Sequence, residues 1–316
     1  MTDRESEHEK RPRALKNSES DARLEDLDRN EKEIIRDHEV ASAKLVHEII
    51  RLRGIAELEK PFFALLWSAL GCGFVIGLSP FAQGILAVSL PDSSYKGVLV
   101  ALGYSVGFIA VIAGRMQLFT ENTLTAVLPL ATTRNRRNLL RTLRMWGIVI
   151  AGNVVGTLGF ALFNHFDLGG MPQVSAAVVA HSVEEMHILM PDAFRRGIPA
   201  GFMIATLVWA SPNLERQDIL IITIITWLMA LGSVAHSIVG CAEMWIAVLS
   251  GAIGLGQGLF AFLIPAILGN IVGGALLFTL LAHAPVRAEI EGSEAKRAVE
   301  ARPRGRISAS AGRGRG

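Results

Sequence analysis

Apolar residues fill most of the chain between positions 61 and 284, in runs long enough to cross a lipid bilayer. A helix needs about 20 such residues to cross a hydrocarbon core of about 30 Å. The runs at 61–88, 145–163, 194–210 and 259–281 each satisfy this length and predict four unbroken spans. The intervening segment 164–191 contains an amphipathic stretch at 174–190 and is expected to lie on the outer side.

Two further apolar runs, 97–131 and 218–250, are too long for one crossing and too short for two. Polar residues interrupt each run midway, at 114–123 and at 233–240. Non-helical backbone at this depth is tolerated only where it lines a cavity or is buried in protein. We therefore expect six spans, of which the second and fifth are broken, with a conduction or binding site at the breaks.

A short sequence occurs twice after the breaks: Gly-Asn-Val-Val-Gly at 152–156 and Gly-Asn-Ile-Val-Gly at 269–273. Asn153 lies 33 positions after Thr120, and Asn270 lies 34 positions after His236. This spacing favours one three-helix unit used twice, and an odd number of crossings requires the two copies to be inverted. Inverted repeats place a site near the midplane. The alternative is that small residues recur because they allow close helix packing.

The two ends of the chain differ from its apolar centre. With 51% hydrophobic residues and a mean hydropathy of +0.39, the chain is too apolar for an ordinary soluble domain. We divide it into a charged, partly helical N-terminal extension (1–60), a transmembrane channel domain (61–284) and a basic, disordered tail (285–316). Apolar residues spaced from Leu24 to Leu52 predict an amphipathic helix that ends near Gly54 and lies solvated against the cytosolic face.

Arginines indicate the orientation. Five of them occur at positions 134, 136, 137, 141 and 144, which predicts a cytoplasmic loop at 132–144 by the positive-inside rule. Because the number of crossings is even, both termini are then expected in the cytoplasm. We expect the protein to lie in the inner (plasma) membrane.

Three candidate functional residues, His236, Glu121 and Glu243, are ionisable and lie inside the apolar runs. His236 is in the second break, and an ionisable residue at membrane depth is a functional candidate by default. Histidine also titrates near neutrality, which suits proton-linked passage of a weak acid. The alternative is a neutral imidazole that is satisfied between helices. Glu121 and Glu243 are candidates for a proton path or for selectivity, or else they pair with Arg115 or cap unwound backbone.

Motifs of enzymes are absent from the sequence. It contains no phosphate-binding glycine loop, zinc-protease motif or nucleophile elbow. We expect no catalytic residue, cofactor or bound metal. His181, Glu185 and His187 could bind a metal, but a solvated amphipathic surface is the preferred interpretation. The basic tail predicts no specific nucleic-acid partner.

Residues around the breaks resemble the formate/nitrite transporter family. Leu-Phe-Thr-x-Asn at 118–122 is similar to its first-break motif, Ala-His-Ser-Ile at 235–238 to its second, and Gly152-Asn153 and Gly269-Asn270 to its third and sixth helices. The resemblance covers about residues 61–284. It implies an all-α, aquaporin-like protomer within a homopentamer, with one pore per protomer and Thr120 and His236 as the central pair. Gly201, Gly240 and Glu121 depart from the family pattern, which leaves the substrate open.

The resemblance implies a channel or transporter for small monovalent weak-acid anions such as formate or nitrite, with His236 assisting proton-coupled or pH-gated passage. The residues expected to line the pore are Phe108, Leu118, Phe119, Thr120, Asn122, Met229 and His236. Two alternatives stay open. One is a membrane scaffold or sensor whose N-terminal tail binds a cytosolic partner, and the other is a channel for a neutral or cationic solute, motivated by Glu121 and Glu243.

Overall fold

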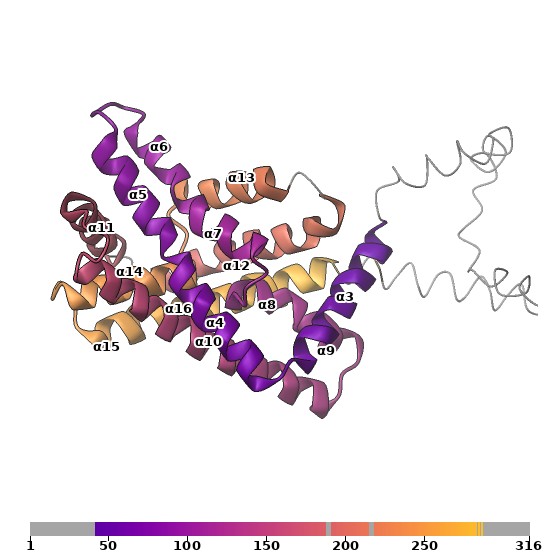
Figure 1. Ribbon diagram of the computed structural model, residues 1–316. Helices are drawn as coiled ribbons and strands as arrows, with labels where there is room; N and C mark the ends of the chain where they lie inside the picture. The colour runs from indigo at the N-terminus through magenta and orange to yellow at the C-terminus, as the bar shows by residue number, and fades with distance from the viewer. Residues whose placement is uncertain (1–41, 188–190, 215–217, 283, 285, 287–316) are drawn as a thin grey trace, which may run out of the picture. The chain divides into compact units, whose positions relative to one another are not determined.

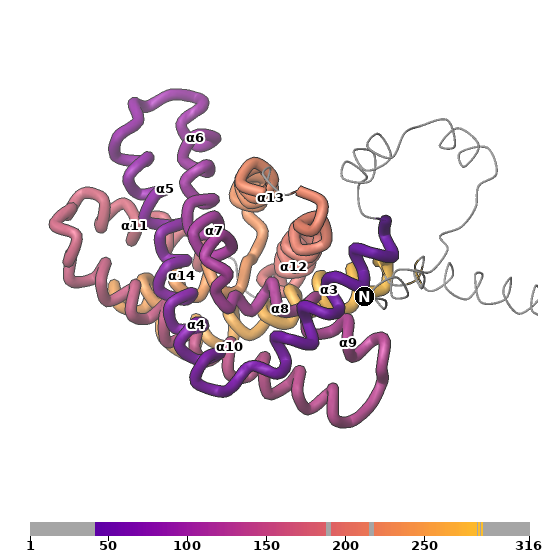
Figure 2. Tube along the Cα trace, turned by 45° about the vertical axis from the view of Figure 1, so that its right-hand side comes forward, coloured from indigo at the N-terminus to yellow at the C-terminus, as the bar shows by residue number. Residues whose placement is uncertain are grey.

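The computed structural model describes residues 42–187, 191–214, 218–282, 284 and 286, and these residues form helices and turns with no strand. Figure 1 shows the helices as a ribbon, and Figure 2 shows the path of the chain after a 45° turn. The predictions for residues 1–41 and for the basic tail after residue 286 fall outside this description.

Four helical stretches among the described residues are long and apolar enough to cross a membrane. They are Phe62–Ser89, Lys96–Ala113, Arg136–His165 and Leu255–Ala282. The first comprises α4 (Phe62–Ile76) and α5 (Leu78–Ser89), and the second comprises α6 (Lys96–Leu102) and α7 (Tyr104–Ala113). The fourth comprises α15 (Leu255–Gln257), η2 (Gly258–Leu263), α16 (Ile264–Asn270), η3 (Ile271–Phe278) and a final turn.

The arginine-rich segment is helical, so the predicted loop at 132–144 is too long. α10 begins at Arg136 and continues without interruption to His165. Asn135 caps it, because its side-chain oxygen accepts a hydrogen bond from the Asn138 amide at 2.7 Å. Thirty helical residues extend about 45 Å, which exceeds a hydrocarbon core of about 30 Å and carries the arginines beyond it.

Both predicted interruptions are present, but each is only five residues long. Between α7 and α8 (Phe119–Thr125) the chain is non-helical at 114–118, and between α13 (Asp218–Leu231) and α14 (Ser237–Leu249) it is non-helical at 232–236. The helix therefore restarts at Phe119, inside the stretch expected to be unwound. Arg115 and Ser233 occupy corresponding positions with φ of 50° and 45°, a left-handed conformation that is uncommon for residues other than glycine.

The N-terminal helix ends later in the chain and is more buried than expected. α3 (Ala43–Glu59) continues past Gly54 and ends just before Pro61, which restricts the preceding residue to extended conformations. Val46, Ile50, Gly54 and Leu58 are buried at helical spacing. They pack α3 against α8 and α9 (Val127–Thr132), so this part of the chain belongs to the helical body.

The long helices pack in two similar pairs. α4 packs along α10, and α12 (Asp192–Ala210) packs along α16 and η3. α11 (Pro172–Glu185) packs on α5 and α14, and η1 (Ser211–Asn213) follows α12. α11 falls within the predicted amphipathic stretch, and α12 agrees closely with the predicted span at 194–210.

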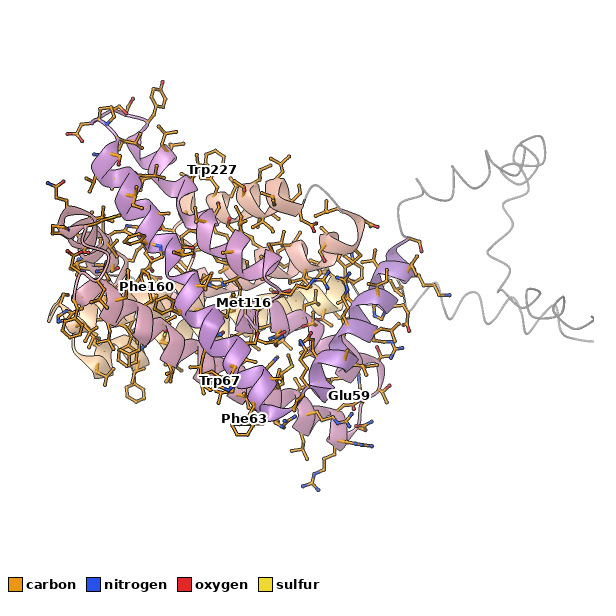
Figure 3. The ribbon with its side chains drawn as sticks, in the orientation of Figure 1. Glu59, Phe63, Trp67, Met116, Phe160 and Trp227 are labelled. Atoms are coloured by element: carbon orange, nitrogen blue, oxygen red, sulfur yellow. The ribbon has the colours of Figure 1, made fainter. Side chains whose placement is uncertain are left out.

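Large apolar side chains point away from this body. Phe63 and Trp67 project from α4 in Figure 3 and are 69% and 70% exposed. Exposed apolar surface of this kind is rare on soluble monomers and is expected where lipid or another subunit covers the protein.

Close backbone contact between helices depends on glycine at two equivalent positions. A Cβ atom on Gly73 of α4 would lie 2.2 Å from the Asn153 carbonyl oxygen, and one on Gly201 of α12 would lie 2.1 Å from that of Asn270. A side chain at either position would force the helices apart.

We expect Gly73→Ala to destabilise the protein by about 1–3 kcal/mol, as overpacking does in other cores. Gly71→Ala is the matched control, because it lies in the same helix and an added Cβ meets nothing within 4 Å. The thermal unfolding midpoints of both variants in detergent provide the measurement. Equal midpoints would contradict the close packing described for Gly73.

Candidate functional site

Asn153 of α10 holds the first break in place. Its side-chain oxygen accepts a hydrogen bond from the Phe119 amide at 3.0 Å. Its Nδ2 donates to the carbonyl oxygens of Ala69 and Gln117, both at 2.9 Å. Asn153 is fully buried, so one side chain supplies a donor and an acceptor to backbone that has left the helix.

Asn270 of α16 makes the same set of contacts at the second break. Its side-chain oxygen accepts from the Ser237 amide at 2.9 Å, and its Nδ2 donates to the carbonyl oxygens of Gly197 and Ala235, both at 2.9 Å. The two breaks thus have matched conformations and matched asparagine partners.

Thr120 and His236 meet between the breaks. Thr120 Oγ1 lies 2.8 Å from His236 Nε2, and the two residues are 0% and 1% exposed. Phe108 packs its ring edge-on against the imidazole, with centroids 4.9 Å apart and planes at 76°. The site therefore brings together one hydroxyl, one imidazole and one aromatic ring, supplied by α8, α14 and α7.

The second imidazole nitrogen of His236 indicates its tautomer. His236 caps α14, and its Nδ1 accepts a hydrogen bond from the Val239 amide at 3.2 Å. Nδ1 must therefore be unprotonated, so a neutral ring carries its hydrogen on Nε2 and donates it to Thr120 Oγ1. A second proton on Nδ1 would break the cap.

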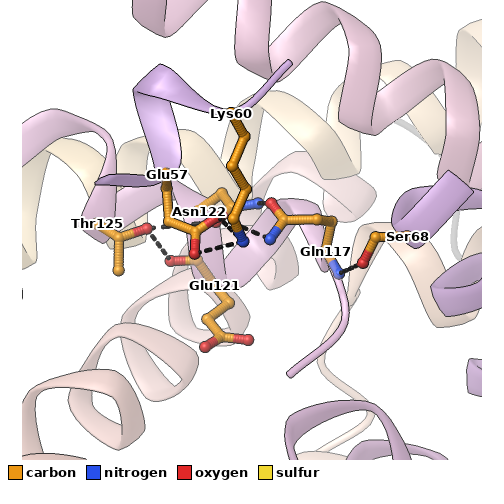
Figure 4. Close-up of polar contacts among 7 residues, drawn as sticks. All are labelled: Glu57, Lys60, Ser68, Gln117, Glu121, Asn122 and Thr125. Atoms are coloured by element: carbon orange, nitrogen blue, oxygen red, sulfur yellow. Dashed lines mark hydrogen bonds and ion pairs between the residues drawn. The ribbon is translucent and has the colours of Figure 1, made fainter. Parts of the chain in front are cut away.

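A cavity of about 340 Å³ lies on the side of the site where α3 packs. Its lining includes Gln117, Glu121 and Asn122 from the first break and from α8, together with Glu57 of α3. Figure 4 shows the polar network: Gln117 Nε2 donates to Glu57 Oε2 at 2.8 Å, and Asn122 Nδ2 donates to Gln117 Oε1 at 3.1 Å. The Lys60 ammonium also pairs with Glu57 at 2.7 Å. α3 is thus bonded directly to the first break.

A smaller cavity of about 30 Å³ lies on the α11 side and is lined by His236, Met229 and Glu243. Gln83, Tyr104, His181 and Glu185 also line it. The His181 Nε2 lies 3.8 Å from the Glu243 carboxylate. The expected contact between Glu121 or Glu243 and Arg115 does not occur among the described ion pairs.

The other predicted pore residues are buried, but several of them line neither cavity. Phe108, Leu118 and Thr120 are fully buried and line neither of the two. Phe119 packs edge-on against Trp146 of α10, with ring centroids 5.8 Å apart. Its side chain therefore belongs to the contact between α8 and α10.

Several residues of the site were not identified from the sequence. Gln83, Glu57 and Gln117 belong to no recognisable motif, and Glu57 and Gln117, which bond to each other, are 60 positions apart. His181 and Glu185 lie one helical turn apart, which placed them on one face, but the sequence did not indicate that this face meets Glu243.

The protein-family model described as formate/nitrite transporter matches residues 44–284. The inner membrane protein YfdC of Escherichia coli K12 is 37% identical to this chain over 287 residues, which cover 88% of this chain and 89% of that protein. The formate channel FocA of Haemophilus influenzae is 27% identical over 201 residues, which cover 55% of this chain and 69% of that protein.

Two solved structures have a similar fold. One is described as an FNT family ion channel, with a TM-score of 0.61 and 18% identity, covering 75% of this chain and 94% of that chain. The other is described as a pentameric formate channel with formate bound, with a TM-score of 0.57 and 18% identity, covering 75% of this chain and 98% of that chain. At this identity the similarity concerns the fold alone.

We expect Asn153→Ala to destabilise the protein, because it leaves the Phe119 amide and the Gln117 carbonyl without their partner, at about 1–3 kcal/mol for each group. Asn138→Ala is the control, since Asn138 lies in the same helix but its contacts are exposed. Thermal unfolding in detergent should show a clearly lower midpoint for Asn153→Ala. If both variants have the same unfolding midpoint, Asn153 does not stabilise the break.

Proposed function

Because the chain belongs to the formate/nitrite transporter family, whose members are channels and transporters rather than enzymes, we propose that it conducts small monovalent weak-acid anions. Formate and nitrite are the first candidates, since the family model names both and a relative is a formate channel. The proposed path connects the two cavities through Phe108, Leu118, Thr120 and His236.

The pairing of Thr120 and His236 carries this proposal. Moving a bare anion into a medium of low dielectric constant costs on the order of 20 kcal/mol before compensation. Hydrogen bonds to a charged group contribute roughly 1.5–3 kcal/mol each, so the Nε2–H of His236 and a threonine hydroxyl offset a small part of this cost. A proton that joins the anion removes most of it. The geometry thus favours passage of a weak acid over passage of a permanent anion.

We propose that His236 orients the passing molecule as a neutral hydrogen-bond donor. Its capping bond to Val239 would be lost if the ring took up a second proton. The expected role as a proton carrier is therefore less well supported than a role in hydrogen bonding. Proton coupling then requires another group.

We further propose the six-span, aquaporin-like architecture with inverted repeats and the orientation expected from the sequence. Support for the repeat comes from the matched contacts of Asn153 and Asn270 and from the left-handed residues Arg115 and Ser233. Support for an inner-membrane location comes from the E. coli relative, an inner membrane protein. In this orientation the arginines of α10, and both termini, face the cytoplasm.

A homopentamer is the proposed assembly. One solved structure of similar fold is a pentameric channel, and the exposed Phe63 and Trp67 give this chain apolar surface for lipid or subunit contacts. The scaffold alternative rests on residues 1–41, which lie outside the described part of the chain. No contact described here favours a cytosolic partner.

We expect His236→Ala to lower formate uptake into proteoliposomes by tenfold or more, which corresponds to a loss of about 1.4 kcal/mol or more. The reason is that the variant lacks the imidazole donor that meets Thr120 in the buried layer. His165→Ala is the control, because His165 is exposed at the end of α10.

The substrate panel should contain formate, nitrite, acetate and methylammonium. If the wild-type protein moves none of the three anions, the proposed function fails. If it moves them and His236→Ala does so equally well, the role given to the histidine is wrong. Uptake of methylammonium in place of the anions would favour the cationic alternative.

A further inference from the structure

The α11-side cavity is rich in hydrogen-bond acceptors. Glu243 of α14 is 5% exposed, and its only described ion-pair partner is His181, at 3.8 Å, which is beyond hydrogen-bond distance. Gln83 of α5 is 4% exposed, and its Oε1 has no hydrogen-bond partner among the described residues. Both side chains line the same cavity as Glu185. Buried acceptors without donors are unfavourable, so the cavity requires a donor.

The groups around the cavity narrow the choice of donor. His181 and Glu185 face Glu243 from α11, Tyr104 faces it from α7, and His236 lies at the start of its own helix. No lysine or arginine is among the described residues that line the cavity. Arg196 and Glu184 are exposed and are not among the lining residues, and Arg196 donates to the Ser233 carbonyl oxygen at 3.3 Å. The carboxylates therefore lack a buried cation to balance them.

The size of the cavity excludes a large ligand. A volume of about 30 Å³ accommodates about one water molecule. Among the described residues, no cluster of three metal-binding side chains occurs here or elsewhere. The donor that fits best is a proton on one of the carboxylates, next to a water molecule or to the head of an entering weak acid.

Building on the proposed function, we propose that Glu185 and Glu243 form a proton-loading site for the transported weak acid. An anion that enters from the α11 side takes the proton of the Glu243 carboxyl group. The O–H bond of Glu243 breaks, an O–H bond forms on the anion, and Glu243 remains as a carboxylate. The neutral acid then passes His236, and Glu243 regains a proton from the outer solution through Glu185 and His181.

The position of each group suits this sequence. Glu243 and His236 line one cavity, so the molecule meets the carboxyl group next to the buried layer. The His181 side chain is 29% exposed and so reaches both the solvent and Glu243. Burial raises the pKa of Glu185, the charge of Glu184 raises it further, and His181 and Arg196 lower it. A raised pKa allows the carboxyl group to hold a proton closer to neutral pH than an ordinary glutamate does.

The first test is formate uptake by proteoliposomes as a function of outer pH, with a pH-sensitive dye inside the vesicles. We expect the wild-type protein to move one proton with each formate. Glu243→Gln should reduce uptake tenfold or more and flatten its pH dependence, because glutamine has no proton to transfer. Glu243→Asp should restore part of the uptake and part of its pH dependence, because aspartate can also carry a proton. Asp92→Asn is the control, since the Asp92 side chain is 99% exposed and lines neither cavity, and it should behave as wild type.

Faster uptake by Glu243→Gln would overturn the proposal, because it would mean that the carboxylate only repels anions. Unchanged uptake would overturn it as well. Methylammonium uptake that is lost in Glu243→Gln would identify a cation site and also reject proton loading.

The second test does not depend on transport. Infrared difference spectra recorded during a pH titration in detergent detect the carbonyl band of a protonated carboxyl group. We expect a band at near-neutral pH that disappears in Glu243→Gln but not in Asp92→Asn. If the wild-type protein transports weak acids but shows no such band, the proton-loading proposal fails and the proposed function stands. A wild-type protein that moves no weak acid would reject the proposed function, and the loading step would fall with it.

Discussion

Backbone that leaves a helix inside a membrane must find new hydrogen-bond partners, because no water is present to supply them. In this protein two asparagines meet that requirement. Asn153 and Asn270 each bond to one amide and two carbonyl groups, and each comes from a helix outside the broken pair. The amide side chain is suited to this task because it combines a donor and an acceptor in one rigid group. The residues that they hold, Phe119 and Ser237, are the chain neighbours of Thr120 and His236.

The cavities on the two sides of the centre differ in their charge balance. On the α3 side Arg53 and Arg115 line the cavity together with Glu57 and Glu121, so both signs of charge are present. On the α11 side Glu185 and Glu243 have no arginine or lysine among the described lining residues. An anion that approaches from the α11 side therefore meets like charge unless a carboxyl group is protonated. The net charge of the α11-side cavity therefore depends on whether its carboxyl groups are protonated. In the α3-side cavity the arginines make this dependence smaller.

The lengths of the apolar runs predicted that two helices break, since bilayer thickness limits the length of a span, and the polar residues within these runs predicted where. They could not predict how short the breaks are, because that depends on the Asn153 and Asn270 contacts with residues far away in sequence. The arginine segment was expected to be a loop from its charge alone, yet Asn135 caps a helix there and Leu139, Leu140 and Leu143 continue it. The meeting of His181 with Glu243 was missed for a related reason. Periodicity indicates which residues share a helix face, but not which helix that face contacts.

The matched anchors also explain why the chemistry at the centre is asymmetric. The asparagines bond to the amides of Phe119 and Ser237, so these two residues occupy equivalent positions. On this alignment Leu118 is equivalent to His236, and Thr120 is equivalent to Ile238. The first of these segments thus contributes Thr120 and the second contributes His236, and the two side chains meet at 2.8 Å. Two histidines at equivalent positions would repel each other when charged, and two leucines would offer no donor to a passing acid. Two matched breaks with one imidazole and one hydroxyl between them avoid both problems, and the imidazole of His236 lines the same cavity as the two carboxylates.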